Sequence, residues 1–134
     1  MSQYVDTSAL LKRYIEEHDS ERAADILDAD TSWVTGRHTW VEVVRNLARL
    51  LEGRELVRIE TAFRRDWRGI HVVELDRVTC ERAAEIARAE GVRTLDALHL
   101  SAAQRVGGLA LPFVTFDAGQ ARAARALGFS VKGC

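Results

Sequence analysis

Short apolar segments alternate along this chain with segments whose apolar residues recur at the spacing of an α-helix, and this alternation restricts the fold most. The apolar segments, interpreted as strands, are residues 3–5, 32–35, 70–75, 111–116 and 129–131. The helical pattern covers residues 8–18, a short segment after Ser20, then 39–51, 55–67, 77–90, 94–106 and 118–127. Strands that alternate with helices form parallel sheets with both faces covered. We therefore predict a three-layer α/β/α domain with a mostly parallel central sheet of four to five strands.

Length and composition fit one folded domain that spans residues 1–134. A chain of 134 residues with 47% hydrophobic and 29% charged residues can bury its own core and is neither disordered nor collagen-like. No apolar run approaches the ~20 residues that cross a membrane, and the first residues lack a signal-peptide pattern, so we expect a cytoplasmic protein. Cys80 and Cys134 have no CxxC partner and no nearby histidine, which excludes zinc-finger, thioredoxin and c-type haem motifs.

Four acidic residues lie among apolar neighbours, whereas most of the others lie in charged stretches. The four are Asp6, Glu42, Asp96 and Asp117. Apolar neighbours predict partial burial, and an ionised carboxylate there is costly unless a cation or several donors compensate it. Helix capping accounts for each acid singly. Glu42 is spaced to form a capping box with Thr39, and the other three are placed in or before the first turn of a predicted helix.

Capping does not explain why the four acids share one edge of the predicted sheet. Asp6 and Asp117 follow strands, and open α/β sheets place their sites at the carboxyl ends of strands. Glu42 and Asp96 lie at helix starts that open onto the same edge. Neither lysine adjoins an acid, and we interpret Arg93 as a surface residue. An all-oxygen site without a basic partner suits Mg²⁺ or Mn²⁺ rather than zinc.

A carboxylate-rich metal site of this kind hydrolyses phosphodiester bonds, because the ion activates a bound water and neutralises charge on the phosphate. The hydroxyls of Thr7, Ser8 and Thr115 adjoin the acids, where they either orient waters and phosphate oxygens or serve only as caps and turn bonds. The formal net charge is −1, so a nucleic acid has to be held by a local patch rather than by the whole surface.

The segments around these acids resemble a PIN domain and, more narrowly, the VapC toxins of bacterial toxin–antitoxin pairs. The resemblance lies in YVDTSALL at residues 4–11, Glu42 at a helix start, RTLDALHLSAA at residues 93–103 and VTFD at residues 114–117, and extends over residues 2–131. It implies a Mg²⁺- or Mn²⁺-dependent endoribonuclease that leaves 5′-phosphate and 3′-hydroxyl ends, forms a homodimer and is inhibited by a cognate VapB antitoxin. It also implies that Asp6 and Asp96 bind the metal directly, and Glu42 and Asp117 directly or through water. One metal ion and two both remain open.

Histidine and arginine residues outside this set have two interpretations each. His99 lies three residues after Asp96, so the two can share a helix face. It is either a general acid or a buried, hydrogen-bonded side chain, and we adopt the second interpretation. The other histidines form no group in the sequence. Arginine supplies 17 of the 19 positive charges. Arg64 and Arg65, on the predicted helix 55–67, are either RNA contacts, which is our hypothesis, or part of a solvated face.

Rival functions share parts of the pattern. A response-regulator receiver needs a lysine late in the chain, and only Lys132, at the tail, is available. An aspartyl-nucleophile phosphatase needs a second aspartate where Ser8 stands. A non-catalytic PIN scaffold that binds RNA or protein is the alternative that the sequence leaves open. The RNA target, the antitoxin and the dimer face are not specified by the sequence.

Overall fold

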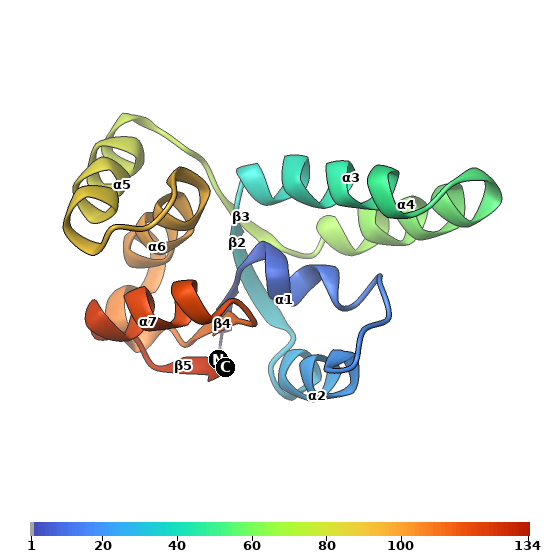
Figure 1. Ribbon diagram of the computed structural model, residues 1–134, viewed down its shortest axis with the longest axis horizontal. Helices are drawn as coiled ribbons and strands as arrows, with labels where there is room; N and C mark the ends of the chain where they lie inside the picture. The colour runs from blue at the N-terminus through green and yellow to red at the C-terminus, as the bar shows by residue number, and fades with distance from the viewer. Residues whose placement is uncertain (1) are drawn as a thin grey trace.

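A computed structural model describes residues 2–134 (Figure 1). Its strands are β1 (Ser2–Val5), β2 (Ser32–Gly36), β3 (His71–Val73), β4 (Phe113–Thr115) and β5 (Val131–Gly133). Its helices are α1 (Thr7–Leu11), α2 (Ser20–Ala29), α3 (His38–Leu50), α4 (Gly53–Trp67), α5 (Arg77–Glu90), α6 (Thr94–Gly107), the 3₁₀ turn η1 (Gly108–Ala110) and α7 (Ala118–Ala126). Within this part of the chain, no helix has both the length and the apolar character needed to cross a membrane.

The five strands form one parallel sheet in the order β3-β2-β1-β4-β5. The first strand therefore lies in the middle, between β2 and β4. This arrangement confirms the predicted α/β class and its parallel sheet. It also sets the carboxyl ends of β1 and β4 side by side, although more than a hundred residues separate them in sequence, because Val5 pairs with Val114.

Alternate residues of the central strands face opposite sides of the sheet, and each side has its own core. Tyr4 and Phe113 stack with ring centroids 5.1 Å apart and pack among residues of α5, α6 and α7. Val5 and Val114 pack on the other side, among residues of α1, α2, α3 and α4. Helices therefore cover both faces of the sheet, which confirms the three predicted layers.

The first helix is shorter than predicted. The pattern indicated a helix over residues 8–18, but α1 ends at Leu11, and the amide of Tyr14 then closes a turn onto the carbonyl of Leu11. The Ser20 hydroxyl accepts a hydrogen bond from the Glu17 amide (2.8 Å) and donates to the Ile15 carbonyl (3.2 Å), which fixes the approach to α2. Leu11, Tyr14 and Ile15 still pack on the core. The apolar spacing thus identified the packed residues correctly but not the backbone that carries them.

Gly53 begins a helix instead of ending one. We expected it to stop the helix over residues 39–51, but α3 ends at Leu50 because Leu51 is extended, with φ −126° and ψ 158°. Gly53 has φ +61° and is the first residue of α4. Its left-handed backbone turns the chain between two adjacent helices, a conformation that glycine adopts at little cost.

Candidate active site

All four acids that the sequence singled out reach one cavity. The cavity has a volume of about 450 Å³ and is lined by Asp6, Thr7, Ser8, Leu11, Glu42, Asn46, Arg93, Asp96, His99 and Asp117. Asp6 follows β1 directly, and Asp117 follows β4 by two residues. Glu42 comes from the N-terminal half of α3, and Asp96 from the first turn of α6. Because β1 and β4 are paired in parallel, the cavity lies beyond the carboxyl ends of the two central strands.

Asp6 combines a helix cap with a place in the cavity wall. Its Oδ1 accepts hydrogen bonds from the Ala9 amide (3.0 Å) and the Ser8 hydroxyl (2.7 Å), and the residue is only 3% exposed. Burial raises the pKa of Asp6, although His99 and the hydroxyls of Thr115 and Ser8 favour the ionised form. An ionised Asp6 is therefore maintained at a cost in free energy, which a cation bound beside it would remove.

Two hydroxyls connect α1 to the end of β4. Ser8 Oγ accepts a hydrogen bond from the Phe116 amide (3.0 Å), and Thr115 Oγ1 accepts one from the Asp117 amide (3.1 Å). The two hydroxyl oxygens are 3.3 Å apart. Asp117 in turn caps α7, since its Oδ1 accepts from the Gln120 amide (2.9 Å). Ser8 lines the cavity, whereas Thr115 is fully buried and fixes the backbone at Asp117 through the hydrogen bond from the Asp117 amide.

Glu42 does not cap α3, so the capping-box prediction is wrong. The helix begins one residue before Thr39, and the Thr39 hydroxyl is hydrogen-bonded to that of Thr35 (2.7 Å). Glu42 Oε1 instead accepts a hydrogen bond from the Thr7 hydroxyl (2.7 Å) and is hydrogen-bonded to Nε2 of His99 (3.0 Å). Burial alone would raise the pKa of Glu42, but the hydrogen bond and charge of His99, together with Thr7, outweigh it and lower the pKa.

His99 joins several elements through hydrogen bonds, in agreement with the buried interpretation adopted from the sequence. Its Nδ1 is 2.8 Å from the Tyr4 hydroxyl of β1. Its Nε2 is 3.0 Å from Glu42 Oε1 of α3 and 3.1 Å from Thr7 Oγ1 of α1. A side chain of α6 therefore fixes the position of a cavity carboxylate on another helix.

Arg93 is a basic neighbour of the acids, contrary to the expectation that they have none. Its Nε is 3.5 Å from Asp96 Oδ2, and its Nη2 is 3.8 Å from Asp117 Oδ2. The side chain is 82% exposed, as a surface residue should be, so water screens its charge. Burial and the charge of Asp117 raise the pKa of Asp96, and Arg93 offsets only part of this rise.

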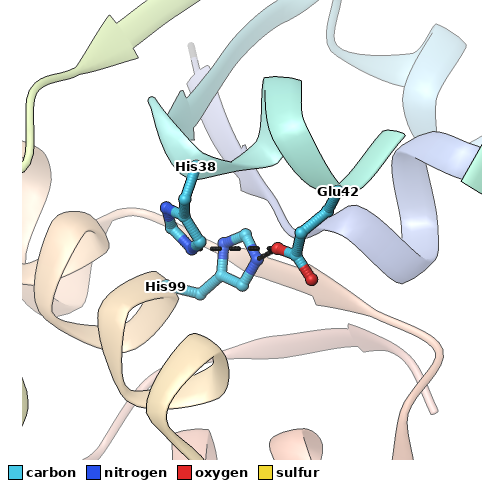
Figure 2. Close-up of side chains that lie close together, drawn as sticks. All are labelled: His38, Glu42 and His99. Carbon is cyan, nitrogen blue, oxygen red and sulfur yellow. Dashed lines mark hydrogen bonds and ion pairs between the residues drawn. The ribbon is translucent and has the colours of Figure 1, made fainter. Parts of the chain in front are cut away.

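Sequence reasoning missed His38 and Asn46. Figure 2 shows His38, Glu42 and His99 pointing toward one another, a group that was not predicted from the sequence. The ring centroids of His38 and His99 are 4.0 Å apart. Asn46 lines the cavity, and its side-chain amide donates to the Glu42 carbonyl (2.8 Å). The available signal was spacing, because residues 38, 42 and 46 recur every four residues along one helix face.

The two arginines assigned to RNA binding lie on α4, outside the cavity lining. Arg64 lies over the Trp40 ring, 4.8 Å from its centroid, and is 3.3 Å from Glu60. Arg65 is exposed, with its Nε 3.8 Å from Asp66. Both side chains are available at the surface, and their contact with RNA stays a prediction.

The donor set of the cavity fits a hard divalent cation. Carboxylates and hydroxyls supply oxygen ligands, and burial raises the pKa of both Asp6 and Asp96. No three of the four acids converge closely: among the described residues, only the group of His38, Glu42 and His99 places three ligand atoms within 4.8 Å of one another. An ion in the cavity would therefore contact some carboxylates directly and others through water, as Mg²⁺ commonly does.

Comparisons with known proteins agree with this geometry. The PIN domain family model matches residues 3–126. The chain is 34% identical over 132 residues to Ribonuclease VapC35 of Mycobacterium tuberculosis, covering 96% of this chain and 93% of the relative. It is 31% identical over 119 residues to Ribonuclease VapC49 of the same organism, covering 85% and 83%.

Solved structures share the fold. The M. tuberculosis toxin VapC20, described as cleaving the sarcin–ricin loop, has a TM-score of 0.74 at 20% identity, with 96% of each chain covered. A toxin–antitoxin complex from Klebsiella pneumoniae has a TM-score of 0.74 at 16% identity, with 98% of each chain covered. The match to the family model and the identity to the curated relatives show that this chain belongs to the PIN domain family, among its VapC-type members.

Proposed function

We propose that this chain is a metal-dependent endoribonuclease and the toxin of a toxin–antitoxin pair. The observation that carries the proposal is the convergence of four carboxylates, from four separate elements, on one cavity whose lining contains a single arginine, Arg93. The names of the curated relatives, which are ribonucleases, support the activity.

The acids of the cavity would hold Mg²⁺ or Mn²⁺. We assign direct contact to Asp6 and Asp96, and contact either direct or through water to Glu42 and Asp117. When bound, such an ion lowers the pKa of a water molecule and offsets the charge that develops on a phosphate. Among the described residues, His99, Thr115 and Ser8 compensate the charge of the buried Asp6 only in part, because its pKa is still raised, and Arg93 is mostly exposed.

The surrounding side chains fix the carboxylates before any ion or substrate arrives. Ser8 and the Ala9 amide hold Asp6 through one oxygen, so the other oxygen is not needed for the cap. Thr7 and His99 hold Glu42 in the same way, through Oε1. Preorganised ligands bind an ion with less loss of conformational entropy, and they stabilise developing charge without having to move.

Binding of the RNA phosphates requires positively charged side chains, and because the net charge of the chain is near zero, these have to come from local groups of arginines. Arg93 lies beside Asp96 and Asp117 but is largely in water, so a metal ion that neutralises these acids leaves its guanidinium available for a substrate phosphate. We assign further phosphate contacts to Arg64 and Arg65 on α4. Which RNA is cleaved, and at which sequence, is the question for the experiment below.

The partner we propose is a VapB-type antitoxin that inhibits the enzyme. Structural neighbours that are themselves toxin–antitoxin complexes support such a partner. We further propose that residues 1–134 act in the cytoplasm as one PIN domain, and that two copies form a homodimer.

The test is cleavage of total cellular RNA by the purified chain, with Mg²⁺ or Mn²⁺ and with EDTA. Sequencing of the new 5′ ends locates the cleavage sites, and enzymes that require a 5′-phosphate identify the end chemistry. We expect cleavage at a few sites, 5′-phosphate ends and complete loss of activity with EDTA. The Asp6→Asn and Asp96→Asn variants should cleave at least about 100-fold more slowly, whereas Asp76→Asn, at an exposed helix cap away from the cavity, should cleave like the wild type.

Two outcomes would contradict this function. Cleavage at the wild-type rate in Asp6→Asn and Asp96→Asn would show a contaminating nuclease or a different site. RNA binding without cleavage under any metal condition would favour the alternative, a PIN scaffold that binds RNA or protein without turnover.

A further inference from the structure

His38, Glu42 and His99 bring two imidazole rings and a carboxylate together beside the cavity (Figure 2). His38 Nε2 is 4.0 Å from Glu42 Oε1, and His99 Nε2 is 3.0 Å from the same oxygen. The three ligand atoms all lie within 4.8 Å of one another. A tetrahedral zinc ion with bonds of about 2.0–2.1 Å separates its ligand atoms by about 3.3 Å, so small movements would bring this group to zinc geometry.

His38 is buried, although its ring makes no hydrogen bond with the described residues. It is 7% exposed, and neither ring nitrogen has a hydrogen-bond partner among residues 2–134. The Leu95 carbonyl lies near enough to favour a protonated ring, but not in hydrogen-bonding geometry. Buried polar groups without partners are rare and costly, and an absent ion is one of the recognised reasons for them.

The surroundings make a specific place for this ring. A Cβ on residue 36 would come within 2.6 Å of His38 Cε1, so the ring occupies the space that Gly36 leaves open. Burial and the neighbouring His99 ring lower the pKa of His38 to about 3. Burial of the ring favours its uncharged form, which is the form that binds metal ions.

We propose that His38, Glu42 and His99 form a zinc-binding site, separate from the all-carboxylate site and joined to it through Glu42. Two histidines and a glutamate are a common zinc donor set, and they leave a fourth position for water. The Tyr4 hydroxyl, 2.8 Å from His99 Nδ1, can accept a hydrogen bond from a protonated Nδ1, and this tautomer leaves Nε2 free to bind the ion.

Zinc at this site would compete for Glu42 with an ion in the cavity. This consequence rests on the proposed ribonuclease function, in which Glu42 is one of the four acids. Zinc would draw the Glu42 carboxylate toward α6 and the two rings, and so reduce cleavage of RNA. The binding itself does not depend on that function.

Zinc binding is measured on tag-free protein, freed of metal with EDTA and then titrated with ZnCl₂ in a calorimeter without Mg²⁺ or RNA. We expect one zinc ion per chain. His38→Gln and His38→Leu should weaken binding by about 100-fold or more, because losing a residue that only orients a ligand already costs about 10- to 100-fold. His18→Gln is the matched control, since His18 is 92% exposed, and it should bind like the wild type.

Thermal unfolding of each variant shows whether it is folded. Two different substitutions at His38 are used so that the test still stands if one variant does not fold. Unchanged zinc binding in a folded His38 variant would overturn the proposal. It would also be overturned if Asp6→Asn or Asp96→Asn abolished zinc binding while the His38 variants retained it, because the ion would then occupy the acidic cavity.

The effect on cleavage is measured as the ratio of each protein's rate with zinc to its own rate without zinc, at constant Mg²⁺. The wild type should lose activity as zinc is added, and the His38 variants should require about 100-fold more zinc for the same loss. If the wild type cleaves no RNA under any condition, the proposed function fails, and calorimetry still decides the zinc site.

Discussion

Helices α1 and α5 both begin with an aspartate cap, yet the two aspartates lie in opposite environments. Asp6 Oδ1 accepts from the Ala9 amide (3.0 Å), and Asp76 Oδ1 accepts from the Thr79 amide (2.9 Å), so the local motif is the same. Burial raises the pKa of Asp6. The Thr79 hydrogen bonds and Arg105 lower the pKa of Asp76, whose side chain is exposed.

The difference is the one expected between an acid that only stabilises the fold and an acid that binds a cation or substrate. The ionised form of Asp76 is favoured by its partners, so its charge stabilises the folded chain. The ionised form of Asp6 is disfavoured by its surroundings, so its charge is retained against a cost in stability. Such a cost is common where a cation or substrate is bound, and rare where only packing matters.

The largest expected effect is on catalysis. Asp6→Asn keeps the cap but removes the charge, and we expect RNA cleavage to fall by about 100- to 1,000-fold, because a lost metal ligand removes several kcal/mol of transition-state stabilisation. Asp76→Asn should stay within about twofold of the wild type, since Asp76 does not line the cavity. Initial rates on one RNA at fixed Mg²⁺ compare the two. Equal losses in both variants would contradict a special role of Asp6.

Metal binding should stabilise the wild type and not the cavity variants. At a metal concentration about 100 times the dissociation constant, the expected gain is about 2.7 kcal/mol in the free energy of unfolding. Mn²⁺ titrations followed by thermal unfolding should show this gain in the wild type and in Asp76→Asn. The gain should be absent or much smaller in Asp6→Asn and Asp96→Asn. A full gain in Asp6→Asn would place the metal elsewhere.

Without metal, the two aspartates should give opposite dependences of stability on pH. The pKa of Asp76 is lowered, so its contribution is present above the unfolded value of about 3.9 and is lost as the pH falls through the folded value. The pKa of Asp6 is raised, so its charge destabilises the fold at neutral pH, and protonation relieves this as the pH falls through the folded value.

Thermal unfolding in EDTA tests both signs. Asp6→Asn should melt above the wild type at neutral pH, and this advantage should shrink on acidification. Asp76→Asn should melt below the wild type at neutral pH, and its deficit should disappear in acid. The same sign in both variants would show that the two caps do not differ as described.

The smallest expected effect concerns Arg93. Because its exposed pairs with Asp96 and Asp117 compete with a cation, Arg93→Gln should bind Mn²⁺ about 1.5- to 5-fold more tightly, which corresponds to ~0.2–1 kcal/mol for an exposed ion pair. Calorimetric titration in low salt measures the change. Weaker metal binding in Arg93→Gln would mean that the guanidinium organises the acids instead of competing for them.

Local patterns predicted most of the fold and the position of the acids. Short apolar segments located β1 and β4, and the rule that parallel strands end at a common edge placed Asp6 near Asp117. The capping of α1 and α7 was also readable, because the distance from cap to amide is set within three residues.

Contacts between distant segments were not readable from those patterns. Thr39 and Glu42 have the spacing of a capping box, but Thr7 and His99, from two other elements, take the Glu42 carboxylate instead. The pairing of His38 with His99 joins residues 61 positions apart, on α3 and α6. Its only local signal was the four-residue spacing from His38 to Glu42, which many surface helices share.

The most direct test of the acidic cavity is an anomalous difference map from crystals of the wild-type chain soaked in Mn²⁺. We expect a peak in the cavity, about 2.1 Å from a carboxylate oxygen of Asp6 and from one of Asp96. A well-ordered map in which those carboxylates contact only Arg93, other side chains or water, with Mn²⁺ bound elsewhere, would contradict it.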